Sequence, residues 1–205
     1  MKILHIDCSP RIESYSRALS AGIVDRLLDT TPDAEVLRRD LGWHPIPHAT
    51  EDYARALSSP AALAMGAEGD EMGLSEELIV ELERADVVVI GTPMNNFTVP
   101  SVLKAWIDQI LRYERTLTSV GAGKKVGLLH DRPVYVAIAS GGVFAGERAN
   151  QPDFLRPYLS AALGCIGLHS LHFFPLQATA FLAPEALDEA FDAVLASFDG
   201  AFAAA

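Results

Sequence analysis

The stretch 86–110 reads DVVVIGTPMNNFTVPSVLKAWIDQI, and it decides the fold. Its first part, Asp86–Gly91, is a continuous β-branched run, which is typical of a strand buried on both faces of a parallel sheet. A polar turn follows, and then Ser101–Arg112 repeats apolar residues at helical spacing. The apolar face of this expected helix carries Val102, Leu103, Trp106, Ile107 and Ile110. A buried strand leading directly into an amphipathic helix predicts a β-α-β arrangement.

The same alternation extends outward in both directions. Strands are expected at Lys2–Asp7, Glu35–Asp40, Asp86–Gly91, Pro133–Ala139 and Ser170–Phe174. Helices are expected at Tyr15–Leu28, Ser75–Arg84, Ser101–Arg112, Phe154–Leu163 and Pro184–Phe198. This order predicts the α/β class, with a parallel sheet covered by helices on both faces. The length of 205 residues fits one domain, so we treat 1–205 as a single unit.

Two segments fit the alternation less well. His44–Gly73 contains three prolines and an alanine-rich piece, AALAMGA, and we expect a long excursion with one helix. Thr116–Lys125 is glycine-rich, and we expect a surface loop there. Ser75 precedes an apolar helical pattern, and we expect it to cap that helix.

Composition and charge limit the classes of function that fit this sequence. Lys and Arg total 16 against 27 Asp and Glu, so the net charge of −11 argues against binding to nucleic acid or to anionic membranes. No apolar run approaches the length of a membrane span, and the first ten residues are too polar for a signal peptide. The two cysteines, Cys8 and Cys165, are far apart in the sequence, which is typical of a reduced cytoplasmic protein.

Ligands of open α/β sheets bind outside the carboxyl ends of the strands, so the loops after the strands matter most. The first such loop, Ser9–Arg17, offers serine hydroxyls, the arginines Arg11 and Arg17, and the start of a helix. Those groups suit a phosphate monoester. Neither a Walker loop nor GxGxxG is present, which argues against a nucleotide bound in those ways. The alternative is an ordinary serine-capped helix with solvated arginines.

The second loop follows the most buried strand and includes Met94, Asn95, Asn96 and Phe97. Paired asparagines tolerate unusual backbone angles and offer amide donors and acceptors. Met94 and Phe97 could lie against a flat aromatic ring. The alternative is a polar turn with two core anchors.

The third loop is Ala139-Ser140-Gly141-Gly142, after the fourth expected strand. Two glycines let a backbone approach a ligand closely, and their N–H groups could face a ring edge that becomes negative on reduction. The alternative is a plain turn. The histidines His130, His169 and His172 lack the spacing of a zinc site, so no metal is expected.

Four segments resemble one enzyme family. SPRIESYS (9–16), TPMNNFTVPSVLKAWIDQILR (92–112), ASGG (139–142) and DFLRPYLSAALGCIGL (153–168) are similar to the FMN-dependent NADH azoreductases, also described as NAD(P)H:quinone oxidoreductases. The resemblance implies a flavodoxin-like three-layer αβα sandwich with a five-stranded parallel sheet in the order 2-1-3-4-5. It also implies FMN as cofactor, NADH or NADPH as electron donor, a quinone or azo compound as acceptor, and a homodimer.

The resemblance also implies roles for residues of the three loops. Ser9, Arg11, Ser14, Tyr15 and Ser16 would hold the FMN phosphate. Pro93, Met94, Asn95, Asn96 and Phe97 would line the ring edge. Ala139, Ser140, Gly141 and Gly142 would bind the pyrimidine side through backbone groups. No side chain would be catalytic, since the flavin N5 carries hydride transfer in a ping-pong cycle.

The sequence departs from this family over Arg115–Ser119, which has no aromatic residue where family members often carry an aromatic pair. That segment usually helps to shape the substrate pocket, so it leaves the preference for quinones or azo compounds open. Two other functions suit the same loops. One is an FMN reductase that supplies free reduced flavin to a partner, and the other is a flavodoxin-type electron carrier, which would show a stable semiquinone.

Overall fold

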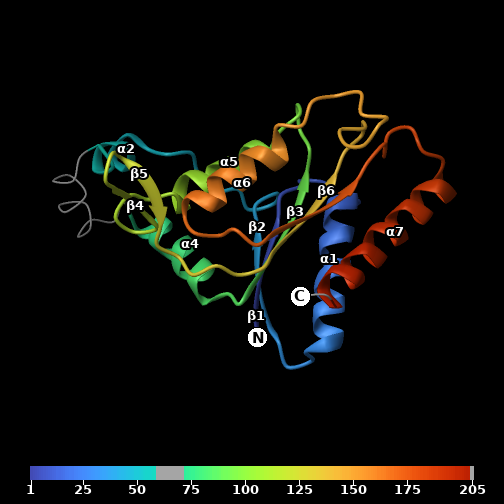
Figure 1. Cartoon of the computed structure of the whole chain (residues 1–205), viewed down its shortest axis with the longest axis horizontal. Helices are drawn as coiled ribbons and strands as arrows, with labels where there is room; N and C mark the ends of the chain where they lie inside the picture. Colours follow the sequence, from blue (N-terminus) through green and yellow to red (C-terminus); the bar gives the residue numbers. More distant parts are fainter. Residues whose placement is uncertain (59–71, 204–205) are drawn as a thin grey trace.

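The expected parallel strands form one sheet in a computed structural model that describes residues 1–58 and 72–203 (Figure 1). The sheet contains β1 (Lys2–Asp7), β2 (Glu35–Asp40), β3 (Val87–Pro93), β6 (Val134–Ala139) and β7 (Leu171–Leu176). Its order is β2-β1-β3-β6-β7, and every neighbouring pair is parallel. The expected order 2-1-3-4-5 is confirmed, because β4 and β5 belong to a separate sheet.

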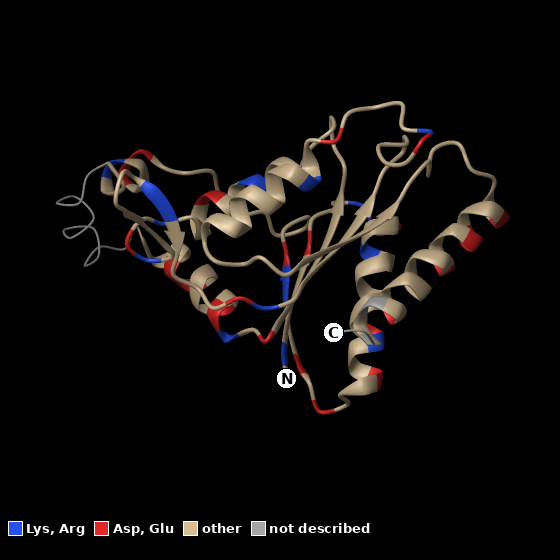
Figure 2. Ribbon diagram, viewed as in Figure 1, with Lys and Arg blue, Asp and Glu red and all other residues tan. Residues whose placement is uncertain are grey.

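Helices cover both faces of this sheet. On one face lie α1 (Tyr15–Thr30) and α7 (Pro184–Ala203), and on the other lie α4 (Gly73–Arg84), α5 (Ser101–Ile110) and α6 (Leu155–Cys165). Figure 2 shows acidic residues along the solvent side of α7, whose buried side carries Leu187, Leu195 and Phe198. Within the described residues, no helix combines the length and the apolarity that crossing a bilayer requires.

The central strand β3 explains the layered core. Val88 and Ile90 pack into the cluster under α4, α5 and α6, whereas Val87 and Val89 pack into the cluster under α1 and α7. Because successive side chains of a strand point to opposite faces, both sets are buried. The unbroken β-branched run in the sequence reflects this two-sided burial.

The expectation of a loop over Thr116–Lys125 is wrong. β4 (Leu117–Val120) and β5 (Lys124–Gly127) form a two-stranded antiparallel sheet. Gly121 and Gly123 have φ of 55° and 85° in the connection, so the glycines mark the turn of a hairpin rather than an open loop.

The hairpin lies close to the turn that follows α6. A Cβ atom on Gly127 would lie 2.1 Å from the backbone nitrogen of Gly167, which itself has φ of 107°. Leu129 N donates to the carbonyl of Ile166 at 3.0 Å just beyond this contact. The hairpin is therefore attached to the main body through backbone that only glycine allows.

Two further expectations concern the segment before β3. The described part of the long excursion contains α2 (Glu51–Ala56), which Thr50 caps, while the AALAMGA piece lies outside the described residues. Ser75 is not a helix cap, because α4 begins at Gly73. Instead Ser75 is buried, and its hydroxyl donates to the carbonyl of Gln109 at 2.7 Å. The serine therefore ties α4 to α5.

Candidate cofactor site

The three loops singled out in the sequence meet at the carboxyl edge of the sheet. Asp7 is in register with Gly91, and Ala139 is in register with both Pro93 and Leu176. Backbone hydrogen bonds extend this pairing beyond the strands. Cys8 N donates to the carbonyl of Gly91 and Met94 N to that of Ala139, each at 2.9 Å. The structure thus brings the loops after β1, β3 and β6 together, at the top of Figure 1.

The first loop combines buried and exposed members. Ser9 and Ser16 are buried, whereas Ser14 is half-buried and Arg11 and Tyr15 are exposed. The Ser9 hydroxyl accepts from Arg11 N at 3.3 Å, and the hydroxyls of Ser14 and Ser16 lie 3.0 Å apart. Ser14 precedes α1 but makes no side-chain cap bond, so the first N–H groups of α1 remain available to an anion.

The two arginines of this loop have different partners. Arg17 donates two hydrogen bonds to the carboxylate of Asp40, at 2.8 and 2.6 Å, and one to the carbonyl of Ser9, at 2.8 Å. Its guanidinium is therefore occupied within the protein. Arg11 remains exposed beside a hollow of about 520 Å³ that Arg17 and Arg38 also line.

The second loop is a tight turn. Asn95 and Thr98 exchange backbone hydrogen bonds of 3.0 Å, and the two residues between them, Asn96 and Phe97, have φ of 47° and 71°. Positive φ at both central residues is typical of a type I′ turn. Asparagine tolerates this conformation, but a phenylalanine there is strained. The turn holds the Phe97 ring outward, where it is 44% exposed.

The third loop is held through its carbonyl groups. Thr179 N donates to Ser140 O at 3.0 Å, Ala178 N to Gly142 O at 3.0 Å, and Ala180 N to Gly141 O at 3.4 Å. Among residues 1–58 and 72–203, the N–H groups of Gly141 and Gly142 donate no hydrogen bond. Two adjacent backbone donors therefore remain at the sheet edge.

Gln151 also belongs to this site, although the sequence did not single it out. Its amide nitrogen donates to the hydroxyl of Ser140 at 2.8 Å and lies 3.5 Å from the sulfur of Met94. A Cβ atom on Gly142 would lie 2.6 Å from the Gln151 amide oxygen. Gln151 thus joins the second and third loops, and it requires the glycine at 142.

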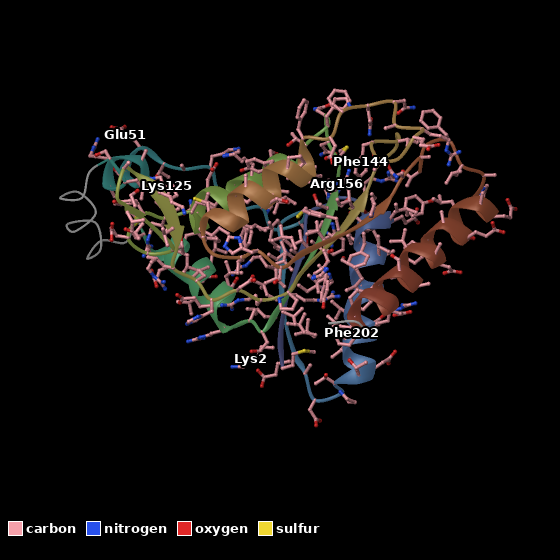
Figure 3. The ribbon with its side chains drawn as sticks, in the orientation of Figure 1. Lys2, Glu51, Lys125, Phe144, Arg156 and Phe202 are labelled. Carbon is pink, nitrogen blue, oxygen red and sulfur yellow. The ribbon has the colours of Figure 1, made fainter. Side chains whose placement is uncertain are left out.

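The segment that carries Gln151 is fixed at its ends. Phe144 is buried, and Arg156 lies over its ring with 5.2 Å between guanidinium carbon and ring centre (Figure 3). The backbone N–H groups of Phe144 and Ala145 both donate to the Gln177 side-chain oxygen at 2.8 Å. Phe154 N donates to the carbonyl of Phe97 at 2.9 Å, which links the segment to the second loop.

Cys8 is the one nucleophilic side chain directly beside the first loop. It is fully buried, and this burial, together with the neighbouring Asp7 carboxylate, raises the pKa of the Cys8 thiol far above its usual value. A protonated, buried thiol is inert. Cys8 therefore packs as a small apolar residue between β1 and β3.

Comparison with solved structures finds the same fold in two azoreductases. The azoreductase of Bacillus anthracis strain Sterne superposes with a TM-score of 0.83 at 22% identity, over 97% of this chain and 96% of that one. The FMN-dependent NADH-azoreductase of Bacillus anthracis strain Ames Ancestor, solved in complex with FMN, gives a TM-score of 0.79 at 25% identity, over 97% of both chains.

Comparison of sequences finds nearer relatives. The FMN-dependent NADH:quinone oxidoreductase 4 of Pseudomonas fluorescens is 47% identical over 87% of this chain and 85% of its own length. The FMN-dependent NADH:quinone oxidoreductase 5 of Burkholderia lata is 43% identical over 94% of this chain and 90% of its own. The sequence profile described as "Flavodoxin-like fold" matches residues 1–200. The chain therefore belongs to the flavodoxin-like family that includes these FMN-dependent NADH:quinone oxidoreductases.

Proposed function

We propose that this protein is an FMN-dependent NAD(P)H:quinone oxidoreductase that reduces quinones by two electrons and can also cleave aromatic azo bonds. The observation that carries the proposal is the meeting of three loops at one sheet edge, with the N–H groups of Gly141 and Gly142 left without partners in the described structure. The names of the sequence relatives support the same chemistry.

The first loop fits the phosphate end of FMN. Arg11 and Tyr15 are exposed and Ser14 is half-buried at the start of α1, where the uncapped helix favours a negative group. Ser9 and Ser16 are buried beside them, and their hydroxyls also contact Arg11 N and Ser14. The proposed phosphate site therefore comprises Ser9, Arg11, Ser14, Tyr15 and Ser16.

The second and third loops fit a flat ring. Pro93, Met94, Asn95, Asn96 and Phe97 would line one edge of it. Ala139, Ser140, Gly141 and Gly142 would present backbone groups to the other edge. Gly142 has the least space for a side chain of the two glycines, because Gln151 lies against it.

The protein residues act by position and electrostatics. Bound FMN would supply the two-electron redox chemistry that amino-acid side chains lack. Preorganised N–H groups stabilise negative charge that develops during a reaction, and one well-aimed donor is worth about 3 kcal/mol in other enzymes. The N–H groups of Gly141 and Gly142 would have this role. With Cys8 buried and protonated, no side-chain nucleophile takes part.

A direct experiment tests this function. The purified protein is reconstituted with FMN, freed of excess cofactor, and examined in the visible range before and after anaerobic addition of NADH. Flavin absorbance should bleach on addition of NADH and return when benzoquinone or an azo dye is added. A protein that retains no flavin absorbance, or whose bound flavin NADH does not bleach, contradicts the proposal.

Three finer features belong to the same proposal. We expect a homodimer, and the exposed Phe97, Phe154 and Phe181 side chains near the loops offer apolar surface for a second copy. Light scattering at known concentration would measure the oligomeric state. Activity with NADH and with NADPH would identify the donor, since the names of the relatives specify NADH. A cytoplasmic location remains a prediction from the two free cysteines.

A further inference from the structure

A cluster at the end of β2 lies directly against the first loop. It consists of Asp40, Gly42 and Trp43 on the β2 side and Arg17 on α1. Arg17 connects the two parts, because it binds both Asp40 carboxylate oxygens and also donates to the carbonyl of Ser9. The backbone follows the same path, with Leu41 N and Gly42 N both donating to the carbonyl of Asp7, at 2.8 and 3.1 Å.

Trp43 completes the cluster from outside. Its ring lies over the Arg17 guanidinium, with 4.4 Å from the guanidinium carbon to the ring centre. The indole N–H donates to the carbonyl of Pro10 at 3.1 Å, and the Trp43 backbone N–H donates to Asp40 at 3.0 Å. The consecutive carbonyls of Ser9 and Pro10 are thus each held by a side chain of this cluster.

Gly42 shows how closely the two segments approach. A Cβ atom at this position would lie 2.1 Å from the carbonyl oxygen of Ser9 and 2.8 Å from an Arg17 nitrogen. The Ser9 carbonyl is part of the backbone and cannot rotate away as the end of a flexible side chain can. Any side chain at 42 would therefore displace the first loop. The close approach fixes the distance between β2 and the first loop.

Arg17 lines the same hollow as Arg11, but its charge is paired within the protein. The Arg17 side chain is 13% exposed, and its positive charge faces Asp40 at 2.6 Å and Asp7 at 3.6 Å. Burial raises the pKa of Asp40, but the hydrogen bonds and charge of Arg17, together with hydrogen bonds from the Trp43 and Gly42 backbone, outweigh it and leave that pKa below its usual value. Arg17 is thus paired with carboxylates and donates to the loop backbone, which favours a positioning role over direct contact with a ligand.

We propose that Asp40, Arg17 and Trp43 act as a clamp that sets the backbone of Ser9 and Pro10 for phosphate binding. The inference rests on the proposed FMN site and adds the residues that preorganise its phosphate end. Preorganisation raises affinity by lowering the cost of ordering a loop on binding. The clamp should therefore matter for ligands that carry the phosphate and not for the same ring without it.

Titration of the cofactor-free protein with FMN and with riboflavin tests the clamp, because riboflavin has the ring but lacks the phosphate. In Arg17→Ala, the Kd for FMN should rise at least about tenfold, while the Kd for riboflavin stays within about twofold of wild type. Trp43→Phe keeps the ring over Arg17 but loses the N–H donor, so it should raise the FMN Kd by a smaller factor.

Arg39→Ala is the matched control. Arg39 is also paired with carboxylates, Glu77 and Glu81, but it lies on the opposite face of β2 toward α4. This variant should leave both flavin affinities at the wild-type value. Circular dichroism would confirm that each variant is folded before it is titrated.

The outcomes distinguish a failure of the clamp from a failure of the proposed function on which it rests. If wild type binds FMN and Arg17→Ala weakens FMN and riboflavin equally, or weakens neither, the clamp is wrong and the proposed function stands. If Arg39→Ala weakens FMN as much as Arg17→Ala does, the clamp is also wrong. If wild type itself binds no FMN, both the proposed function and the clamp are overturned.

Discussion

At the scale of single residues, the contact between Gly142 and Gln151 gives a sharp prediction. Gly142→Ala places a methyl group where the Gln151 amide oxygen lies, 2.6 Å away. The side chain must then leave Ser140 and Met94. We expect the FMN Kd to rise about tenfold, measured by flavin fluorescence.

Two variants control for this effect. Gly200→Ala, on α7 and outside the three loops, adds a methyl group that would meet no atom within 4 Å, so its FMN affinity should stay near wild type. In the double variant Gly142→Ala/Gln151→Ala the clash partner is gone, so the loss should be smaller than the sum of the single losses. Strict additivity would show that the two residues do not act through this contact.

The sequence predicted the chemistry of the site residues better than their contacts. Paired glycines and serines are local signals, and the structure places them at one sheet edge. Gln151 and Trp43 have no such signal, because each lies in a loop and reaches the site through long-range contacts with Ser140 and Pro10. The pairing of Arg17 was not predictable for the same reason, since its partner Asp40 is 23 residues away.

At the scale of elements, Asp131 joins the starts of β6 and β7. Its carboxylate accepts from His169 N at 2.8 Å and from the Ser170 hydroxyl at 2.8 Å. Residual burial raises its pKa, but these hydrogen bonds outweigh that effect and lower the pKa to about 2. A lowered folded-state pKa stabilises the protein above the unfolded value, and the stabilisation is lost as the pH falls toward about 2.

Asp131→Asn should therefore be less stable than wild type near neutral pH. The difference in unfolding free energy should shrink as the pH falls from about 5 to about 2, because the wild-type carboxylate is then protonated. Urea unfolding at several pH values measures it. Asp25 is an exposed carboxylate on α1, and Asp25→Asn serves as control. Its unfolding free energy should change with pH in the same way as that of wild type. A constant difference for Asp131→Asn would contradict this assignment.

Two of the glycines inside helices, Gly22 and Gly200, offer a matched pair. A Cβ atom on Gly200 of α7 would meet no atom within 4 Å, so Gly200→Ala should stabilise the protein by about 0.5–1 kcal/mol through the unfolded chain. On Gly22 of α1 it would lie 3.1 Å from Leu195, so Gly22→Ala should gain less or lose stability. Thermal unfolding of the two variants measures these changes in stability. An equal increase in both would contradict the crowding at Gly22.

Element types were predictable where one periodicity dominated. The parallel strands and the amphipathic helices were found because burial imposes a period on their apolar residues. The β4–β5 hairpin was missed because its strands are short and Gly121 and Gly123 dominated the composition. Ser75 was predicted to cap the helix because its hydrogen bond to Gln109, on a neighbouring helix, cannot be inferred from the sequence.

At the scale of the whole molecule, β3 couples the two core layers. Ile90→Ala removes atoms beneath α4, α5 and α6, and Val89→Ala removes atoms beneath α1 and α7. We expect Ile90→Ala to cost about 2–5 kcal/mol and Val89→Ala somewhat less, each in one cooperative transition. Fluorescence and circular dichroism during urea unfolding should give the same midpoint. Separate midpoints would show that the layers unfold independently.

The close contact between Gly127 and Gly167 has an evolutionary consequence. A side chain at 127 would meet the backbone of Gly167, and a side chain at 167 would meet the Leu129 carbonyl oxygen at 2.4 Å and require a φ of 107°. In an alignment of many homologues, both positions should therefore remain glycine wherever the β4–β5 hairpin is present. Frequent side chains at 127 or 167 in homologues that keep the hairpin would argue against this constraint.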